Sequence, residues 1–140
     1  TNTLKGNMIV FLRRVKYPMT WFVTIVIIVL SMIPVPEVPE LDNVPFFDKW
    51  VHFVMYAALS LVVWMDRVLI CRNKMSGTLW TFLFVYPSVL GGVMELAQAY
   101  LTTCRSGDWL DFYADVFGSL LGLILCILVD KPVRKLLIRK

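Results

Sequence analysis

Ionisable side chains interrupt a hydrophobic part of the chain near residue 50. Asp48, His52 and Tyr56 are spaced four residues apart, so a helix places all three on one face. Lys49 is adjacent, and His52 is the only histidine in the sequence. Imidazole changes its charge near neutral pH and can act as a general acid, a general base or a nucleophile, while a lysine can hold a phosphate as a point charge. The stretch is therefore a candidate wall of a binding or catalytic site.

Two later segments carry polar groups that complement this stretch. Glu95 and Gln98 are three residues apart, and Asp111 and Asp115 are four apart, so each pair shares one helix face. Arg105 lies between the pairs, and its guanidinium can hold a phosphate through paired N–H donors. If the fold brings these segments together, they form one cluster of acid–base and phosphate-binding groups.

The elements that position these residues are membrane helices. The 140 residues are 59% hydrophobic, with a mean hydropathy of +0.72 and 17% charged residues, which excludes an ordinary soluble domain. Crossing a bilayer takes about 20 largely apolar helical residues, and the ranges 17–33, 50–65, 78–101 and 112–129 come close to that length. No small-residue cleavage site follows the first range, so we expect a retained helix. The sequence predicts an all-α polytopic membrane protein, a bundle of four transmembrane helices.

The lysines and arginines predict the orientation of the bundle. Four of the 14 precede the first helix, three lie in the 66–77 loop and five follow the last helix, so twelve share one side. Only Lys49 and Arg105 lie on the other side. By the positive-inside rule both termini are cytoplasmic and the polar cluster faces outward. The net charge of +4 then reflects contact with anionic lipid, and no nucleic-acid partner is expected.

The chain divides into one membrane domain and two basic flanks. Residues 1–16 form an amphipathic basic segment on the cytoplasmic side, residues 17–130 form a single four-helix domain, and residues 131–140 form a basic cytoplasmic tail. The proline-rich, acidic stretch 34–45 cannot be helical, and it is the only long connection available as a lid. Cys71, Cys104 and Cys126 fall at different depths, so no intramolecular disulfide is expected.

Small residues and a proline predict how the helices pack. Pro87 and the pair Gly91 and Gly92 predict a kink and a close helix contact in the third helix. Gly118 and Gly122, four residues apart, predict a packing face on the fourth helix.

The charged groups within the membrane segments are all expected in the outer half, and none in the inner half. Glu95 lies six residues before the predicted helix end at Leu101, or roughly 9 Å deep at 1.5 Å per residue. A carboxylate at that depth costs several kcal/mol unless it is paired or solvated. Glu95 should therefore face the bundle interior, with Lys49, His52 or Arg105 as its partner.

Several of these residues also have a simpler explanation. Asp48 and Asp111 suit the N-terminal caps of the second and fourth helices, where the helix dipole favours an acid. His52 can alternatively be a packing histidine, whereas capping cannot explain Glu95 inside a helix. Anchoring at the membrane interface is the simpler role for Lys49, Trp50, Trp109 and Tyr113.

Three motifs in order resemble the VanZ-like family of small bacterial membrane proteins. They are Asp-Lys-x-x-His-Phe-x-x-Tyr at 48–56, Glu-x-x-Gln at 95–98, and Arg105 followed by Asp111, Asp115 and Gly118. The resemblance covers roughly residues 46 to 122 and departs from the family at Asp115, where the family usually has Asn. It implies a multi-pass protein of the bacterial cytoplasmic (inner) membrane that acts in the cell envelope. The family's namesake is linked to reduced susceptibility to the antibiotic teicoplanin, and the resemblance implies no reaction mechanism.

Three functions are considered for the cluster, and lipid binding ranks first. An outward-facing pocket would bind the headgroup of an anionic membrane lipid or a lipid-linked envelope precursor, with Arg105 and Lys49 on its phosphate. The expected ligand-binding residues are Asp48, Lys49, Tyr56, Gln98, Arg105 and Asp115. A catalytic version adds His52 as acid, base or nucleophile, with Asp111 or Glu95 orienting its ring. No recognised catalytic motif is present, so binding is expected over turnover, and enzyme activity is left undecided.

The other two functions are a structural role and a metal site. In the first, the cluster is an internal ion-pair network and the protein acts through an envelope partner protein. The cluster contains five acids and at most three bases, even with His52 protonated. Pairing among its own side chains therefore leaves acids unmatched, which fits a purely structural role less well. In the second, His52, Glu95, Asp111 and Asp115 hold a divalent cation. Their spacing matches no diagnostic metal motif, so no residue is assigned as a metal ligand and no cofactor is named.

Overall fold

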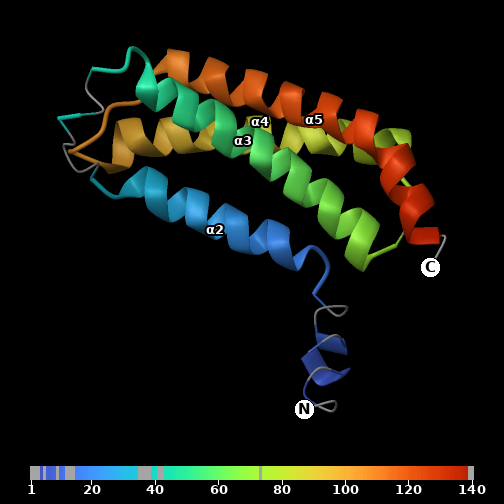
Figure 1. The fold of residues 1–140 in the computed structure, drawn as a ribbon. Helices are drawn as coiled ribbons and strands as arrows, with labels where there is room; N and C mark the ends of the chain where they lie inside the picture. Colours follow the sequence, from blue (N-terminus) through green and yellow to red (C-terminus); the bar gives the residue numbers. More distant parts are fainter. Residues whose placement is uncertain are drawn as a thin grey trace.

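The computed structural model describes residues 4, 6–8, 10–11, 15–34, 39–40, 43–72 and 74–138. Within these ranges every regular element is helical, which confirms the all-α prediction (Figure 1). The elements are α2 (Pro18–Met32), α3 (Phe47–Met65), the π-helical turn η1 (Asp66–Ile70), α4 (Gly77–Leu101) and α5 (Trp109–Ile138).

Three helical stretches are long and apolar enough to cross a membrane: Phe47–Ile70, Gly77–Leu101 and Trp109–Leu137. The chain is therefore a multi-pass membrane protein. The 15 residues of α2 span about 22 Å at 1.5 Å per residue, which is shorter than a hydrocarbon core of about 30 Å. A fourth crossing and cytoplasmic termini stay predictions.

Two helices extend beyond their predicted ranges. α3 begins at Phe47 and continues past Met65 as η1, and α5 runs from Trp109 to Ile138. An interior proline removes one backbone hydrogen bond, and α5 continues past Pro132 nonetheless. Residues 131–138 of the predicted basic tail are thus an extension of α5.

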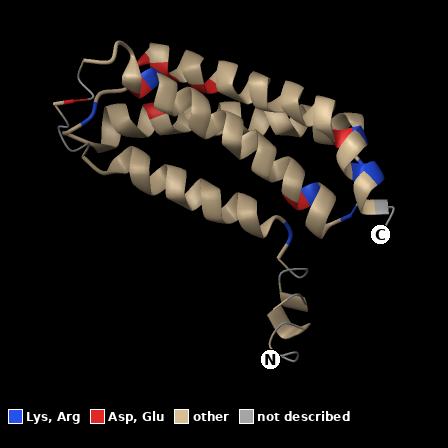
Figure 2. Cartoon of the chain, viewed as in Figure 1, with Lys and Arg blue, Asp and Glu red and all other residues tan. Residues whose placement is uncertain are grey.

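Helices α2 to α5 run alternately in opposite directions, so each end of the bundle collects two N-termini and two C-termini (Figure 1). The end of the bundle where Lys49 of α3 contacts Asp108, just before α5, is called the site end. The opposite end, where Trp64 of α3 contacts Asp130 of α5, is called the basic end. Figure 2 shows the charged residues gathered toward these two ends, with the middle of the helices uncharged.

The most extensive helix contact joins α3 and α5. A Cβ at Gly118 would collide with the carbonyl oxygen of Phe53, and a Cβ at Gly122 would lie 2.6 Å from the Cβ of Ser60. This confirms the predicted packing face of small residues. Two clusters of buried apolar residues lie beside this contact and toward α2 and α4, made of Ile27, Tyr56, Leu59, Val63, Trp64, Val68, Leu83 and Cys126.

The predicted close contact at Gly91 and Gly92 joins α4 to α5. A Cβ at Gly91 would lie 2.6 Å from Oδ2 of Asp115, and a Cβ at Gly92 would lie 3.3 Å from the ring of Phe112. The missing side chain at Gly91 therefore leaves the space that the Asp115 carboxylate occupies. α4 continues through Pro87, and the kink there stays a prediction.

A buried carboxylate at the basic end corrects one expectation. Asp66 belongs by sequence to a solvent-exposed loop, but its exposed fraction is 0% because α3 continues into η1. Its carboxylate accepts the N–H of Thr20 at 2.7 Å, the hydroxyl of Thr20 at 2.8 Å and the N–H of Met19 at 3.3 Å. The first N–H groups of a helix have no partner within it, so Asp66 caps α2. The prediction that only the half with the polar cluster contains embedded charged groups is wrong.

Two predicted segments are only partly described. In the amphipathic segment 1–16, the side chains of Leu4, Met8 and Phe11 are exposed, and most of the basic residues lie outside the described ranges. Half of the 34–45 connection also lies outside them, so its role as a lid stays a prediction. All three cysteines are free, as expected.

Candidate functional site

His52 lies in the second turn of α3 and is only 5% exposed. Its Nδ1 is 2.9 Å from Oδ1 of Asp115 on α5, so a protonated Nδ1 donates to the carboxylate. The ring of Tyr56 stacks on the imidazole, with 10° between the planes and 6.5 Å between the centroids. The sequence predicts Asp111 or Glu95 as the orienting group. Asp115 takes this position instead, because Oδ2 of Asp111 is 3.9 Å from Nε2, too long for a hydrogen bond.

Glu95 faces the bundle interior, as predicted, and is 7% exposed. Its Oε2 accepts the backbone N–H of Asp108 at 2.7 Å. The loop can come this close because Gly107 has no side chain: a Cβ there would lie 2.6 Å from the carbonyl oxygen of Glu95. The second oxygen, Oε1, is buried and has no hydrogen-bond partner among the described residues. The hydrogen-bond partner of the Glu95 carboxylate is therefore a backbone N–H, where the sequence predicts a basic side chain.

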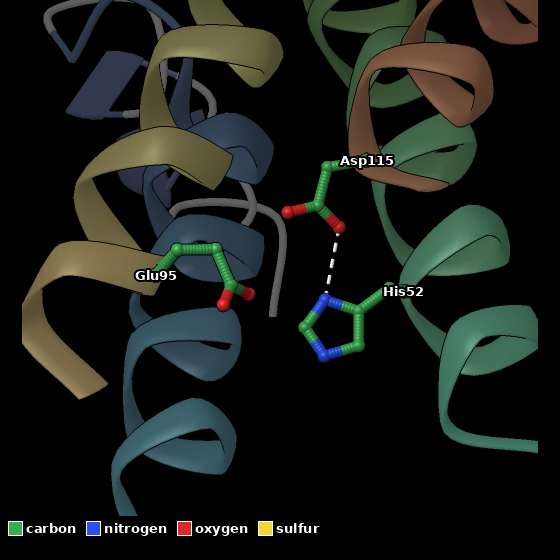
Figure 3. A group of neighbouring side chains, drawn as sticks. All are labelled: His52, Glu95 and Asp115. Atoms are coloured by element: carbon green, nitrogen blue, oxygen red, sulfur yellow. Dashed lines mark hydrogen bonds and ion pairs between the residues drawn. The ribbon is translucent and has the colours of Figure 1, made fainter. Parts of the chain in front are cut away.

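Three helices bring His52, Glu95 and Asp115 to one point. One nitrogen of the imidazole and one oxygen of each carboxylate all lie within 4.8 Å of one another. Figure 3 shows the Glu95 and Asp115 carboxylates approaching the imidazole from α4 and α5. Asp115 has an exposed fraction of 0%, and its Oδ2 is unpartnered among the described residues, as is the hydroxyl of Tyr56. The predicted meeting of these distant segments is therefore present in the structure.

Lys49 is surrounded by carboxylates. Its Nζ lies 2.9 Å from Asp48, 3.0 Å from Asp108 and 2.9 Å from Asp111. An ammonium has three N–H donors, and these contacts use all of them. Asp108 also accepts the N–H of Leu110 at 2.9 Å. These contacts, the Leu110 N–H first and then Lys49, hold the pKa of Asp108 below its usual range.

Asp48 and Asp111 are not the N-terminal caps that the simpler explanation assigns to them. Asp108, not Asp111, precedes α5 and caps it through Leu110. The N-cap of α3 is Phe46, which makes no side-chain cap, and Asp48 lies in the first turn. Exposed aromatic side chains at the site end, suited to interface anchoring, include those of Trp50, Trp109 and Tyr113.

Arg105 and Gln98 attach the end of α2 to the site. Nη1 of Arg105 donates to the carbonyl oxygens of Leu30 at 3.2 Å and Ser31 at 3.0 Å. Nε2 of Gln98 donates to the same Ser31 oxygen at 3.0 Å. A guanidinium has five N–H donors, and within the described part of the chain only Nη1 of Arg105 is used. The remaining donors make no contact with the described residues and could serve a ligand.

Two pockets meet at the site end and share Pro34, Asp48 and Arg105. The first, of about 270 Å³, is mainly apolar and is otherwise lined by Leu30, Ser31, Ile33, Phe47, Val51, His52 and Met55. The second, of about 320 Å³, is polar and is otherwise lined by Gln98, Cys104, Ser106, Asp108 and Asp111. A separate, mainly apolar pocket of about 390 Å³ between α4 and α5 reaches Glu95.

Gly107 and Asp108 position the site. The sequence does not single out Gly107, and it counts Asp108 only among the five acids of the cluster, with no role assigned to it. The signal available for Asp108 is its place directly before the apolar run of α5, which is typical of an N-cap. Gly107 carries no local signal beyond a turn-forming Ser-Gly-Asp sequence.

Taken together, these features define a class: a multi-pass helical membrane protein with a buried polar cluster at one end of the bundle. Comparison of the chain with models of protein families, with curated proteins and with solved structures found no match. The function is therefore inferred from the residues of this chain.

Proposed function

We propose that the protein is an integral membrane protein of the bacterial cell envelope that binds the headgroup of an anionic lipid or of a lipid-linked envelope precursor. The observation that carries this proposal is the junction of an apolar pocket and a polar pocket around Asp48 and Arg105. A lipid has the same two-part character. Its hydrocarbon chain fits the wall formed by Leu30, Val51 and Met55, and its headgroup fits the polar pocket beside it.

Arg105 is the side chain best placed to hold a phosphate. It lines both pockets, and only one of its nitrogens is engaged with the described residues. An arginine fork matches two phosphate oxygens through parallel N–H donors. The sequence predicts phosphate contacts for both Arg105 and Lys49. In this proposal only Arg105 binds the phosphate, because the ammonium of Lys49 is already engaged with three carboxylates.

The proposal includes α2 as a fourth membrane crossing. Asp66 caps the first turn of α2 at the basic end, and Ser31 near its last turn accepts from Arg105 and Gln98 at the site end. α2 therefore lies along the bundle for its whole length, as Figure 1 shows. Its exposed large side chains are apolar: Trp21, Phe22, Ile25, Val26, Ile28, Val29 and Leu30.

The distribution of basic residues supports an outward-facing site. Residues 66–72, 74–77 and 130–138 lie toward the basic end, and the positive-inside rule places such an end in the cytoplasm. The site end would then meet the outer leaflet, where a lipid-linked envelope precursor is accessible. The resemblance to the VanZ-like family supports the same location, the bacterial cytoplasmic membrane, and a role in susceptibility to teicoplanin.

A second candidate function is chemistry on the bound headgroup. His52 lines the apolar pocket, and Asp115 orients its ring through the 2.9 Å contact at Nδ1. An imidazole held in this way can accept or donate a proton at Nε2. Under this function His52→Ala abolishes turnover of the lipid while the lipid remains bound.

Native mass spectrometry tests the lipid proposal. The protein is released from its own membrane in a mild detergent, and its bound lipids are compared between the wild type, Arg105→Ala and Arg72→Ala. Arg72 is exposed at the basic end, so its replacement is a matched loss of one guanidinium away from the site. We expect a phosphate-bearing lipid on the wild type and on Arg72→Ala, and its loss from Arg105→Ala.

The proposal fails if all three proteins are free of lipid, or if Arg105→Ala retains the same lipid as the wild type. Because Arg105 also holds α2, thermal melting of Arg105→Ala shows whether the fold is intact. Met55→Trp gives an independent variant, since it fills the apolar pocket without removing a charge. This variant should also lose the lipid.

A further inference from the structure

We propose that His52, Glu95 and Asp115 bind one divalent cation, and that this cation contacts the phosphate of the lipid headgroup. The cation site stands on the geometry of the three side chains alone. Its contact with phosphate rests on the function proposed above.

The three side chains offer their donor atoms at nearly the spacing that a bound ion needs. One imidazole nitrogen and two carboxylate oxygens, from α3, α4 and α5, lie within 4.8 Å of one another (Figure 3). Neighbouring donors on an ion with bonds of about 2.1 Å are about 3.0–3.4 Å apart, and donors on opposite sides of it are about 4.2 Å apart. Rotation of the three side chains toward one another would therefore bring their donor atoms to these separations.

Two carboxylate oxygens of the cluster have no hydrogen-bond partner among the described residues and could bind a cation. Oε1 of Glu95 and Oδ2 of Asp115 are buried and make no hydrogen bond to any described residue. Both side chains are more than nine-tenths buried. A buried carboxylate oxygen without a partner is costly, and a cation between the two carboxylates satisfies both. The buried hydroxyl of Tyr56, also unpartnered in the described part of the chain, stacks beside His52 and can bind water on the ion.

The charges around the cluster are not balanced by the protein's own cations. Lys49 is engaged with Asp48, Asp108 and Asp111, and Arg105 donates to backbone carbonyls. Among the described residues, no lysine or arginine forms an ion pair with the carboxylates of Glu95 and Asp115. A divalent cation supplies the missing positive charge and turns an acidic cluster into one that accepts an anionic headgroup.

The donor set favours Mn²⁺ or Zn²⁺. Imidazole suits Zn²⁺ and carboxylates suit Mn²⁺, whereas Ca²⁺ and Mg²⁺ prefer sites built from oxygen alone. Three protein donors leave positions open for a phosphate oxygen and water. Asp111 is not part of the set, because one of its oxygens binds Lys49 at 2.9 Å. The four residues that the sequence offers for a cation thus reduce to three.

Titration with the metal ion alone tests the site. The protein is stripped with EDTA, placed in nanodiscs of zwitterionic phosphatidylcholine and titrated with Mn²⁺, with free Mn²⁺ followed by electron paramagnetic resonance. We expect one Mn²⁺ per chain, displaced by Zn²⁺. Glu95→Gln should weaken binding by at least about 10- to 100-fold, the loss typical of disturbing a metal site. Glu40→Gln is the matched control, because this exposed glutamate lies outside the three-residue set and lines neither pocket of the lipid site.

The inference is overturned if the wild type binds neither Mn²⁺ nor Zn²⁺ stoichiometrically, or if Glu95→Gln binds Mn²⁺ as tightly as Glu40→Gln. The wild-type measurement decides the question even if a variant fails to fold. Failure of the lipid proposal is separately visible: a protein that binds Mn²⁺ but carries no Arg105-dependent lipid has the cation site without the lipid function. A protein that binds no Mn²⁺ but keeps its Arg105-dependent lipid after EDTA treatment has the lipid function without the cation site.

Discussion

Replacing Gly118 by alanine tests the contact between α3 and α5 that brings His52 to Asp115. A Cβ at position 118 would collide with the carbonyl oxygen of Phe53. This obstacle is backbone, so it cannot rotate away as a flexible side chain would. The variant can fold only if α3 and α5 move apart.

The size of the effect follows from two opposing contributions. Overpacking a close contact costs about 1–3 kcal/mol, whereas Gly→Ala inside a helix gains up to about 1 kcal/mol. Because the obstacle is backbone, we expect the upper end of the first range and a net loss of about 2 kcal/mol. That loss lowers the melting temperature by roughly 6 °C for a chain of this size. The matched control is Gly77→Ala, since a Cβ there meets nothing within 4 Å.

The buried thiol of Cys126 provides the assay. It has an exposed fraction of 0% and lies one turn after Gly122 on α5. With Cys71 and Cys104 replaced by serine, a thiol-reactive fluorophore labels the protein only when α5 leaves its contact with α3. The reasoning is refuted if Gly118→Ala melts at or above the temperature of Gly77→Ala.

Three further predictions concern individual side chains. Gly91→Ala adds a Cβ 2.6 Å from the Asp115 carboxylate, so it should weaken Mn²⁺ binding at least about 10-fold in the titration above; unchanged affinity would remove Asp115 from the site. Asp66→Ala leaves the Thr20 N–H and hydroxyl without their buried acceptor and should lower the free energy of unfolding by about 1–3 kcal/mol in a thermal melt, with lipid retention unchanged. Asp108, whose pKa is lowered, stabilises the fold above its ordinary pKa of about 4 and loses this contribution as the pH falls further. The melting temperature of Asp108→Asn should therefore depend less on pH below about 4 than that of the wild type, and parallel curves would contradict the assignment.

The sequence predicts the helices and the meeting of the polar segments for physical reasons. Long apolar runs in a membrane must satisfy their backbone internally, which leaves helices as the solution. Glu95 and His52 lie within such runs, and a polar group there must face the bundle interior. Alternating helix directions then bring the two residues to the same end. The small residues at Gly118 and Gly122 similarly predict a close approach of two helices.

The detailed partners could not be predicted, because they depend on helix rotation and on loop paths. Asp111 and Asp115 lie one turn apart on the same face of α5, so spacing alone cannot tell which of them reaches His52. The position of α3 along α5 decides it, and at that position the backbone of Phe53 lies against Gly118. The burial of Asp66 could not be predicted either, because it depends on a π-helical turn that extends α3 past Met65.

The central claim is that the site end binds a phosphate-bearing amphiphile in the pocket beside Arg105. The most direct test is photo-crosslinking in vesicles of phosphatidylcholine with a small fraction of phosphatidylglycerol that carries a diazirine on its acyl chain, followed by mapping of the labelled peptides. The proposal predicts label concentrated on residues 47–55 of α3 and the end of α2, and its loss in Arg105→Ala but not in Arg72→Ala. Label spread evenly over the lipid-facing surfaces of α4 and α5, and unchanged in Arg105→Ala, would contradict it.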